Sequence, residues 1–158
     1  MNRRVGVSGA VILTVAALAA TSAIGARTNF AQYRTKVNAL CRSYTPRIKR
    51  IEATMTAAQK AGNNQKVAEE LGVLIGISLA EGTRVEAVPV PADGRKRMAK
   101  PLRLLRSADA HARKLLREAA AGDQTGVVTE LTALDSAAAP LNHAFDAVGL
   151  RDCGSNQS

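Results

Sequence analysis

Apolar residues recur at every third or fourth position along four stretches of the chain, with polar residues between them. The stretches cover residues 29–61, 64–88, 93–121 and 123–148. This spacing places the apolar side chains on one face of an α-helix. In the first stretch these positions are Val37, Leu40, Tyr44, Ile48, Ile51, Met55 and Ala58. The pattern therefore predicts four helices.

Helix-breaking residues separate the predicted helices. The breaks are Gly62-Asn63-Asn64, Pro89-Val90-Pro91 and Gly122-Asp123. A link as short as Gly122-Asp123 makes the helices on either side antiparallel neighbours. Asp123 suits the N-cap of the fourth helix, and Gly149 suits the left-handed position after its end, where Leu150 can fold back on Phe145. We therefore predict an all-α fold, an up-down four-helix bundle.

The amino-acid composition agrees with this fold class. The chain is 46% hydrophobic and 22% charged, with two Phe, two Tyr and no Trp among 158 residues. That balance is typical of a folded domain, and the shortage of aromatic side chains argues against a β-sandwich, whose pleated core they fill.

Pro46 lies inside the first predicted helix. The spacing of apolar residues keeps its phase across Pro46, so we expect one continuous helix that is kinked there. Alternatively, Thr45 and Pro46 form the N-cap and first turn of a separate helix.

The second predicted helix contains ten consecutive uncharged residues, 71–80. Ten residues are too few to span a bilayer, so we expect a helix that is buried on most sides. Gly72, Gly76 and Ala80 form a stripe of small residues along it. We expect the stripe to receive a neighbouring helix of the same chain, with dimerisation in a membrane as the alternative.

The first 26 residues resemble an export signal in their composition. Arg3 and Arg4 precede residues 5–26, which carry no charge and end in small side chains. Such a segment could also stay uncleaved as an anchor helix with its N-terminus inside. We therefore divide the chain into residues 1–26, a signal peptide or N-terminal membrane anchor helix, and residues 27–158, an exported bundle domain. Both interpretations place the domain outside the cytoplasm, either secreted or held at the cytoplasmic membrane through residues 5–26.

Cys41 and Cys153 are the two cysteines of the chain. An even number of cysteines in an exported chain predicts a disulfide, with two free thiols as the alternative. Linking them closes a loop of roughly 113 residues, which the chain-entropy model values at about 4–5 kcal/mol. Neither cysteine belongs to a CxxC pair, so metal or redox chemistry is not predicted.

The sequence carries no motif for catalysis, a metal or a cofactor. Its two histidines, His111 and His143, lie outside any Glu-x-x-His, HExxH or CxxCH pattern. On a helical wheel, His143 falls opposite the apolar face of its helix, and His111 falls between the basic and apolar arcs. We predict a non-enzymatic protein, with His143 exposed and His111 at the edge of its helix face.

Positive charge is concentrated in one segment. Residues 95–117 hold nine basic side chains against Asp109 alone, a net charge of +8, whereas residues 27–158 together carry +7. Most of these charges fall opposite the leucines of the same helix, and a helix with one basic side is typical of binding to an anionic surface. The candidate binding residues are Arg95, Lys96, Lys100, Arg103, Arg106, Arg113 and Arg117.

The basic segment predicts a binding or interaction module of the cell envelope. Its partner would be anionic lipid, an anionic envelope polymer or a protein. Export and the absence of aromatic side chains from the segment argue against nucleic acid, although nucleic acid favours the same charge. A basic face that only keeps the bundle soluble is the simpler interpretation. The alternative function is a carrier for a small molecule or lipid, with a cavity between the first, second and fourth helices.

Two short segments also support a resemblance. They are VNALCRSYTPRIKRIEA around Cys41 and AFDAVGLRDCG around Cys153. The chain resembles uncharacterised secreted or membrane-anchored two-cysteine helical proteins of high-GC Gram-positive bacteria. The matching residues are Cys41, Gly149, Leu150, Cys153 and Gly154. The resemblance implies an envelope domain tied by a disulfide and implies no catalytic activity.

Overall fold

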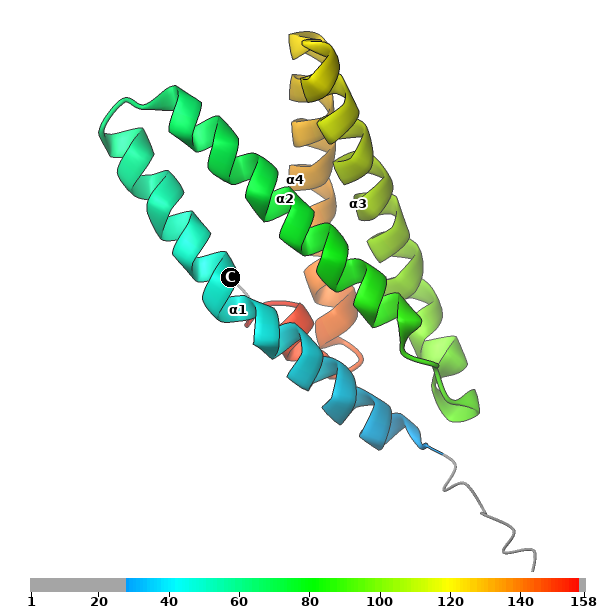
Figure 1. The fold of residues 1–158 in the computed structure, drawn as a ribbon. Helices are drawn as coiled ribbons and strands as arrows, with labels where there is room; N and C mark the ends of the chain where they lie inside the picture. Colours follow the sequence, from blue (N-terminus) through cyan, green and yellow to red (C-terminus); the bar gives the residue numbers. More distant parts are fainter. Residues whose placement is uncertain (1–27, 157–158) are drawn as a thin grey trace, which may run out of the picture.

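The structure, a computed structural model, describes residues 28–156. The predicted signal or anchor in residues 1–26 lies outside the described residues. Within them the chain forms four α-helices and two single-turn 3-10 helices and contains no strand, so the predicted all-α class is confirmed. In chain order the elements are α1 (Phe30–Lys60), α2 (Asn64–Ala87), η1 (Ala92–Gly94), α3 (Arg95–Ala121), α4 (Gln124–Asp146) and η2 (Arg151–Cys153) (Figure 1).

Side chains cap the beginnings of three of these helices. Asn29 accepts a hydrogen bond from the backbone N–H of Gln32, whose own side chain accepts one from the backbone of Asn29. Asn63 caps α2, and Asp123 accepts from the N–H of Gly126 at the start of α4. These bonds satisfy backbone donors that a helix leaves without a partner at its N-terminus. The predicted cap at Asp123 is confirmed.

The end of α4 also follows the prediction. Gly149 has φ of +80°, a left-handed conformation that glycine adopts without strain. The N–H of Gly149 donates to the carbonyl of Asp146 at 2.9 Å, and the N–H of Leu150 donates to that of Phe145 at 2.9 Å. This pair of bonds is the Schellman motif, and the fully buried Leu150 belongs to the same core cluster as Phe145.

Helix α1 runs without interruption from Phe30 to Lys60 with Pro46 inside it. The alternative of two helices that meet at Thr45 is therefore wrong. The kink at Pro46 stays a prediction.

The four helices form a bundle made of two antiparallel hairpins, α1–α2 and α3–α4. Helix α2 packs on α3, and η2 contacts both α1 and α4, so the C-terminal segment connects the two hairpins. Figure 1 shows the hairpins crossing, with the α1–α2 turn well separated from the α3–α4 turn. The predicted helical bundle is confirmed in this form.

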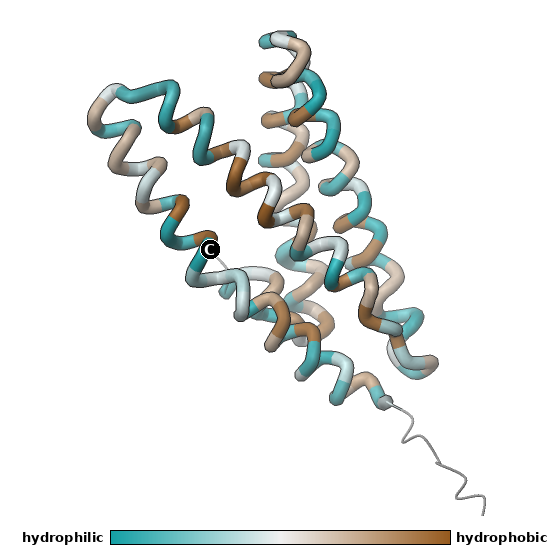
Figure 2. Tube along the Cα trace, in the orientation of Figure 1, coloured by the Kyte–Doolittle hydropathy of each residue, from teal (hydrophilic) through white to brown (hydrophobic). Residues whose placement is uncertain are grey.

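Three clusters of apolar side chains make up the core. One joins Ile48, Ile51 and Ile77 between α1 and α2, and one joins Ile75 to Ala112 and Leu115 where α2 crosses α3. The largest cluster includes residues from all four helices and η2. Its buried members are Phe30, Tyr33, Val37, Cys41, Val85, Val88, Met98, Leu105, Phe145, Leu150 and Cys153. Figure 2 shows the corresponding alternation of hydrophobic and hydrophilic positions along each helix.

The small-residue stripe of α2 does not pack as predicted. Gly76 and Ala80 are exposed, and a Cβ added at Gly72 or Gly76 would meet nothing within 4 Å. The reason is that α2 packs on α1 through Ile77 and on α3 through Ile75, and neither contact involves the stripe. The expectation of a neighbouring helix against the stripe is therefore wrong, and dimerisation through it stays untested. No helix in residues 28–156 is long and apolar enough to cross a membrane.

Candidate functional site

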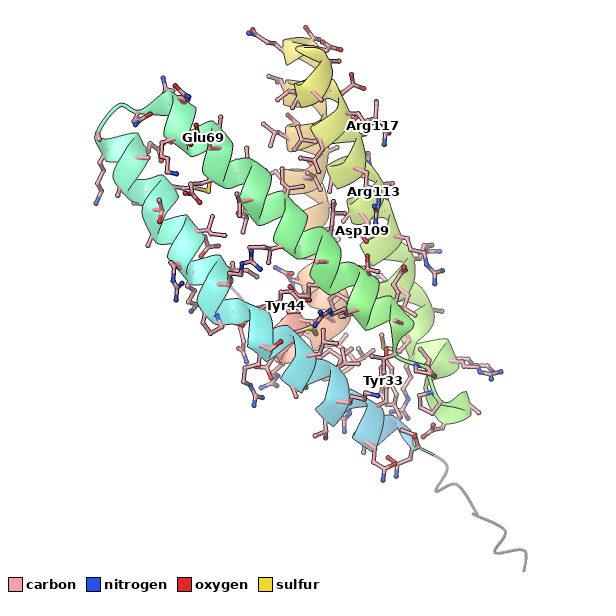
Figure 3. All side chains as sticks on the ribbon, in the orientation of Figure 1. Tyr33, Tyr44, Glu69, Asp109, Arg113 and Arg117 are labelled. Carbon is pink, nitrogen blue, oxygen red and sulfur yellow. A yellow bond between two sulfur atoms is a disulfide. The ribbon has the colours of Figure 1, made fainter. Side chains whose placement is uncertain are left out.

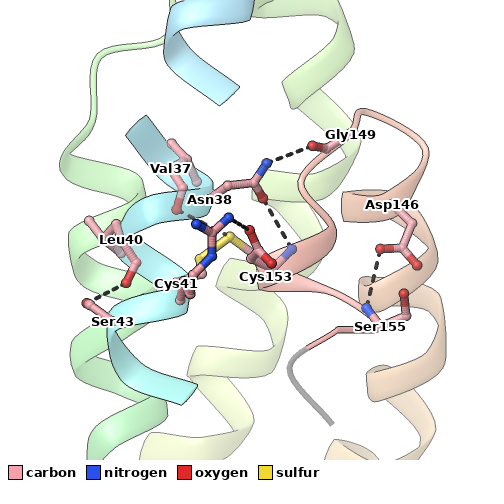
Figure 4. Close-up of a disulfide and its surroundings, with 11 residues drawn as sticks. Val37, Asn38, Leu40, Cys41, Ser43, Asp146, Gly149, Cys153 and Ser155 are labelled. Carbon is pink, nitrogen blue, oxygen red and sulfur yellow. Dashed lines mark hydrogen bonds and ion pairs between the residues drawn. A yellow bond between two sulfur atoms is a disulfide. The ribbon is translucent and has the colours of Figure 1, made fainter. Parts of the chain in front are cut away.

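The two cysteines form the predicted disulfide. Cys41 of α1 and Cys153 of η2 are joined with a Cα–Cα distance of 5.2 Å, 112 residues apart in the chain (Figure 4). Both cysteines are buried in the largest core cluster. The disulfide therefore fastens the end of the chain to the first hairpin.

Polar side chains hold the C-terminal segment on α1 beside the disulfide. The Asn38 side chain donates to the carbonyl of Gly149 at 3.0 Å and accepts from the N–H of Asp152 at 3.2 Å (Figure 4). Arg42 pairs with the carboxylate of Asp152 at 2.6 Å. None of these three polar side chains was predicted from the sequence, although Asn38, Arg42 and Asp152 all lie within three residues of a cysteine or of Gly149.

The basic side chains of α3 are exposed. All nine, from Arg95 to Arg117, reach solvent, while Met98, Leu105 and Ala112 are buried on the opposite side of the helix. Figure 3 shows Arg113 and Arg117 on the part of α3 beyond its crossing with α2. The seven predicted binding residues thus all lie on α3 with their side chains exposed.

Some of these charges already have partners. Arg106 pairs with Glu86 of α2 at 2.7 Å, and Lys114 pairs with Glu130 of α4 at 2.7 Å. The guanidinium of Arg97 lies 5.3 Å from the centre of the Phe30 ring. Within residues 28–156, six of the seven predicted binding residues make no ion pair of 4 Å or less. They are Arg95, Lys96, Lys100, Arg103, Arg113 and Arg117. Arg113 still interacts electrostatically with Asp109.

Helix α1 also carries many basic side chains, which were not predicted as a feature of the sequence. It has seven basic residues and one acidic residue, whereas α4 carries no Lys or Arg and three acidic residues. Six of the seven are exposed and make no ion pair among the described residues. They are Arg34, Lys36, Arg47, Lys49, Arg50 and Lys60. A count of charges for each predicted helix, rather than for the densest segment, would have found them.

His111 has a more specific environment than predicted. Its Nδ1 lies 2.6 Å from a carboxylate oxygen of Glu130, which is only 3% exposed and also binds Lys114. Hydrogen bonds hold the pKa of Glu130 below its usual value; the largest effect comes from Lys114 and the next from His111. This cluster joins α3 to α4. His143 is exposed, as predicted, and residues 28–156 contain no group of three or more side chains placed to hold a metal ion.

A cavity of about 190 Å³ lies between α2, α3 and α4, next to the disulfide. Its apolar lining includes Leu79, Val85, Leu105, Leu134, Leu141 and Phe145. The carrier cavity predicted from the sequence lies between the first, second and fourth helices, whereas the observed cavity is lined mainly by α2, α3 and α4. Helix α1 contributes only Cys41 to the lining, because α2 rather than α1 is the helix whose backbone lies against α3.

Among the residues that the structure describes, two acidic residues and no Lys or Arg line this cavity. Glu81 is 7% exposed, and the carboxylate of Asp109 lies against α2 at Gly82, where an added Cβ would be 2.9 Å from both of its oxygens. Burial raises the pKa of Asp109 from 3.8 to about 6; Arg113 opposes this shift and Glu86 adds to it. The cavity therefore combines apolar walls with a carboxylate that is poorly solvated.

Comparison with known proteins gives no matching family model, no matching curated protein and no matching solved structure. The resemblance based on the two cysteine segments stays a prediction. The features that indicate a function are therefore the exposed basic side chains of α3 and the cavity between α2, α3 and α4.

Proposed function

We propose that the protein is an exported, non-enzymatic domain that docks on an anionic surface of the cell envelope through the basic face of α3. The observation that carries this proposal is the row of exposed basic side chains without an ion pair. A basic side chain near an anionic membrane contributes about 1 kcal/mol. Several of them on one rigid helix would hold the domain at such a surface at moderate salt.

The length of the row supports an extended partner. Between Arg95 and Arg117 the helix rises by about 33 Å, at about 1.5 Å for each residue. Packing of Met98 and Leu105 in the core fixes the orientation of this face. Lipid headgroups or an anionic polymer offer charges over such a length, which a small anion does not.

The position of the first described residues favours a lipid surface. The backbone N–H of Phe30 donates to Asp93 at 3.1 Å, so the start of α1 lies beside the start of α3. If residues 5–26 stay in the membrane as an anchor, the bundle joins them at the end that carries Arg95 and Lys96. These side chains would then be close to the headgroups of the outer leaflet.

Binding to vesicles with matched charge variants tests the proposal. A chain of residues 27–158 with its disulfide formed is mixed with phosphatidylcholine vesicles, with or without phosphatidylglycerol, and sedimented. We expect binding only to the anionic vesicles, and weaker binding as salt increases. Replacing four basic residues of α3 by Gln should weaken it by about tenfold or more. The four are Lys96, Lys100, Arg103 and Arg117.

The control removes the same charge from α1. Its four replacements by Gln are at Lys36, Arg47, Lys49 and Arg50, which are exposed and unpaired in the described part of the chain. We expect this variant to bind nearly as well as the parent. Equal losses in both variants would mean that net charge alone acts, and a parent that does not bind at all would contradict the proposal.

The cavity supports a second candidate function, carriage of a small molecule. Ligand sites are typically concave, mostly apolar and lined by a few polar groups, and the cavity between α2, α3 and α4 has these properties. A native mass spectrum of the protein isolated from its own host tests this function. A carrier should retain a ligand of defined mass, which should disappear when the protein is denatured.

A further inference from the structure

We propose that the cavity between α2, α3 and α4 binds a small organic cation, with its ammonium group at the Asp109 carboxylate and its apolar part among the leucines. This inference rests on the second candidate function and specifies the class of ligand. It is independent of docking through α3.

The volume of the cavity limits the ligand to about the size of a single ring. An apolar cavity of about 150 Å³ engineered into another protein accommodates benzene. At about 190 Å³ the present cavity has room for a ring with a short substituent and is too small for a lipid acyl chain. Of the two kinds of cargo considered for a carrier, the geometry therefore favours the small molecule over the lipid.

The charge of the lining selects a cation. The chain as a whole has a net charge of +9, yet among the described residues the ionisable side chains that line the cavity are Glu81 and Asp109, both acidic. The basic side chain that acts on Asp109 is Arg113, one turn along α3 and exposed to solvent. An ammonium group in the cavity would find the Asp109 carboxylate with which to pair, whereas an anion would be repelled by that carboxylate.

The position of Asp109 fits this role. Because Gly82 has no side chain, the carboxylate can lie directly against the backbone of α2, at the wall of the cavity. Figure 3 shows Asp109 on α3 where that helix crosses α2. Partial burial of the Asp109 carboxylate raises the free energy of its ionised form, because the carboxylate loses contact with water. A cation that enters the cavity would lower that free energy again by pairing with it.

Asn142 of α4 adds a second polar group. It lines the same cavity from a different helix, and it is partly buried. A side-chain amide can donate to or accept from a substituent of the ligand. The site thus has the composition expected for a ligand with one charge, one apolar ring and one further polar group.

A pair of probes with the same ring tests the inference. Benzylamine is cationic and benzyl alcohol is neutral, and both are titrated by calorimetry into the full-length, oxidised chain in phosphatidylcholine nanodiscs, with empty nanodiscs as the blank. At about pH 7.5 the amine is protonated and Asp109 is ionised. We expect benzylamine to bind about tenfold more tightly, as a charge-assisted hydrogen bond allows.

Two variants locate the effect. Asp109→Asn should reduce benzylamine affinity to that of benzyl alcohol and leave the alcohol unchanged, which also shows that the cavity is intact. Asp135→Asn removes the same charge from an exposed position of α4 outside the cavity and should change neither affinity.

The outcomes separate this inference from the function on which it rests. Equal affinity of the parent for both probes, or a preference that survives Asp109→Asn, would overturn cation selectivity and leave a neutral cargo as the carrier's ligand. Absence of binding by either probe would overturn both the inference and the carrier function. Neither outcome affects docking through α3.

Discussion

The carboxylate of Asp109 on α3 rests on the backbone of Gly82 on α2, where a Cβ would lie 2.9 Å from each of its oxygens. Direct packing between the two hairpins is made chiefly where α2 crosses α3. The absence of a side chain at Gly82 therefore leaves the space that the Asp109 carboxylate occupies against α2.

Gly82→Ala should destabilise the protein, whereas Gly76→Ala should stabilise it. Alanine favours a helix over glycine by about 1 kcal/mol, and at the exposed Gly76 an added Cβ meets nothing within 4 Å. At Gly82 the same gain is opposed by the contact with Asp109, so we expect the free energies of unfolding in urea to differ by about 2 kcal/mol. Combining Gly82→Ala with Asp109→Ala should recover most of the loss. A loss that persists in the double variant would mean that another contact is responsible.

Asp109 should make stability fall as the pH rises. Burial raises the pKa of its carboxyl from 3.8 to about 6, so the folded state holds the proton more tightly than the unfolded state does. The stabilisation that the protonated Asp109 side chain gives the folded state is complete below about pH 3.8 and is lost as the pH rises through its folded pKa of about 6. Because the group is partly exposed, we expect a change of about 1 kcal/mol. The difference in unfolding free energy between the parent and Asp109→Asn, measured from pH 4 to pH 7, isolates this contribution from other carboxylates. A difference that is constant with pH would contradict it.

Local features of the fold were predictable because they depend on neighbouring residues. Asp123 caps α4, and Gly149 with Leu150 ends it, because cap and end signals act within one turn of a helix. The pairing of Cys41 with Cys153 was also predictable, since two cysteines allow a single intramolecular disulfide.

The candidate sites could be predicted less well, because they form where faces of different helices meet. Sequence periodicity alone does not show which faces pack together. Helix α2 is apolar over much of its circumference, so its pattern could not show that Gly76 faces solvent and Ile75 faces α3. The contribution of α3 to the cavity lining was therefore not predictable from the sequence. Asp109 and Gly82 are far apart in sequence and belong to different hairpins, and their contact follows only from that packing.

The disulfide should contribute most of the stability of the C-terminal segment. Replacing Cys41 and Cys153 together by Ser should lower the free energy of unfolding by about 4 kcal/mol, as expected for closing so long a loop. Asn38→Ala removes two hydrogen bonds from the same segment but leaves the disulfide, and should cost about 1–2 kcal/mol. Urea unfolding of both variants, with the parent measured with and without reductant, checks these values. A reduced parent as stable as the oxidised one would show that core packing alone holds the segment.

Filling the cavity should stabilise the protein and block the small-molecule site together. Ala108 lines the cavity, and Ala108→Leu adds three carbon atoms to a space that the native side chains leave open. Burying them should raise the free energy of unfolding by about 1 kcal/mol, provided that the walls need not move. The same change at the exposed Ala110 of α3 is the matched control, since a leucine there would project into solvent. Benzyl alcohol should bind the Ala110→Leu variant as it binds the parent, and should not bind Ala108→Leu. A filled variant that still binds the alcohol would place the small-molecule site elsewhere, because a ligand and a leucine side chain cannot occupy the same volume.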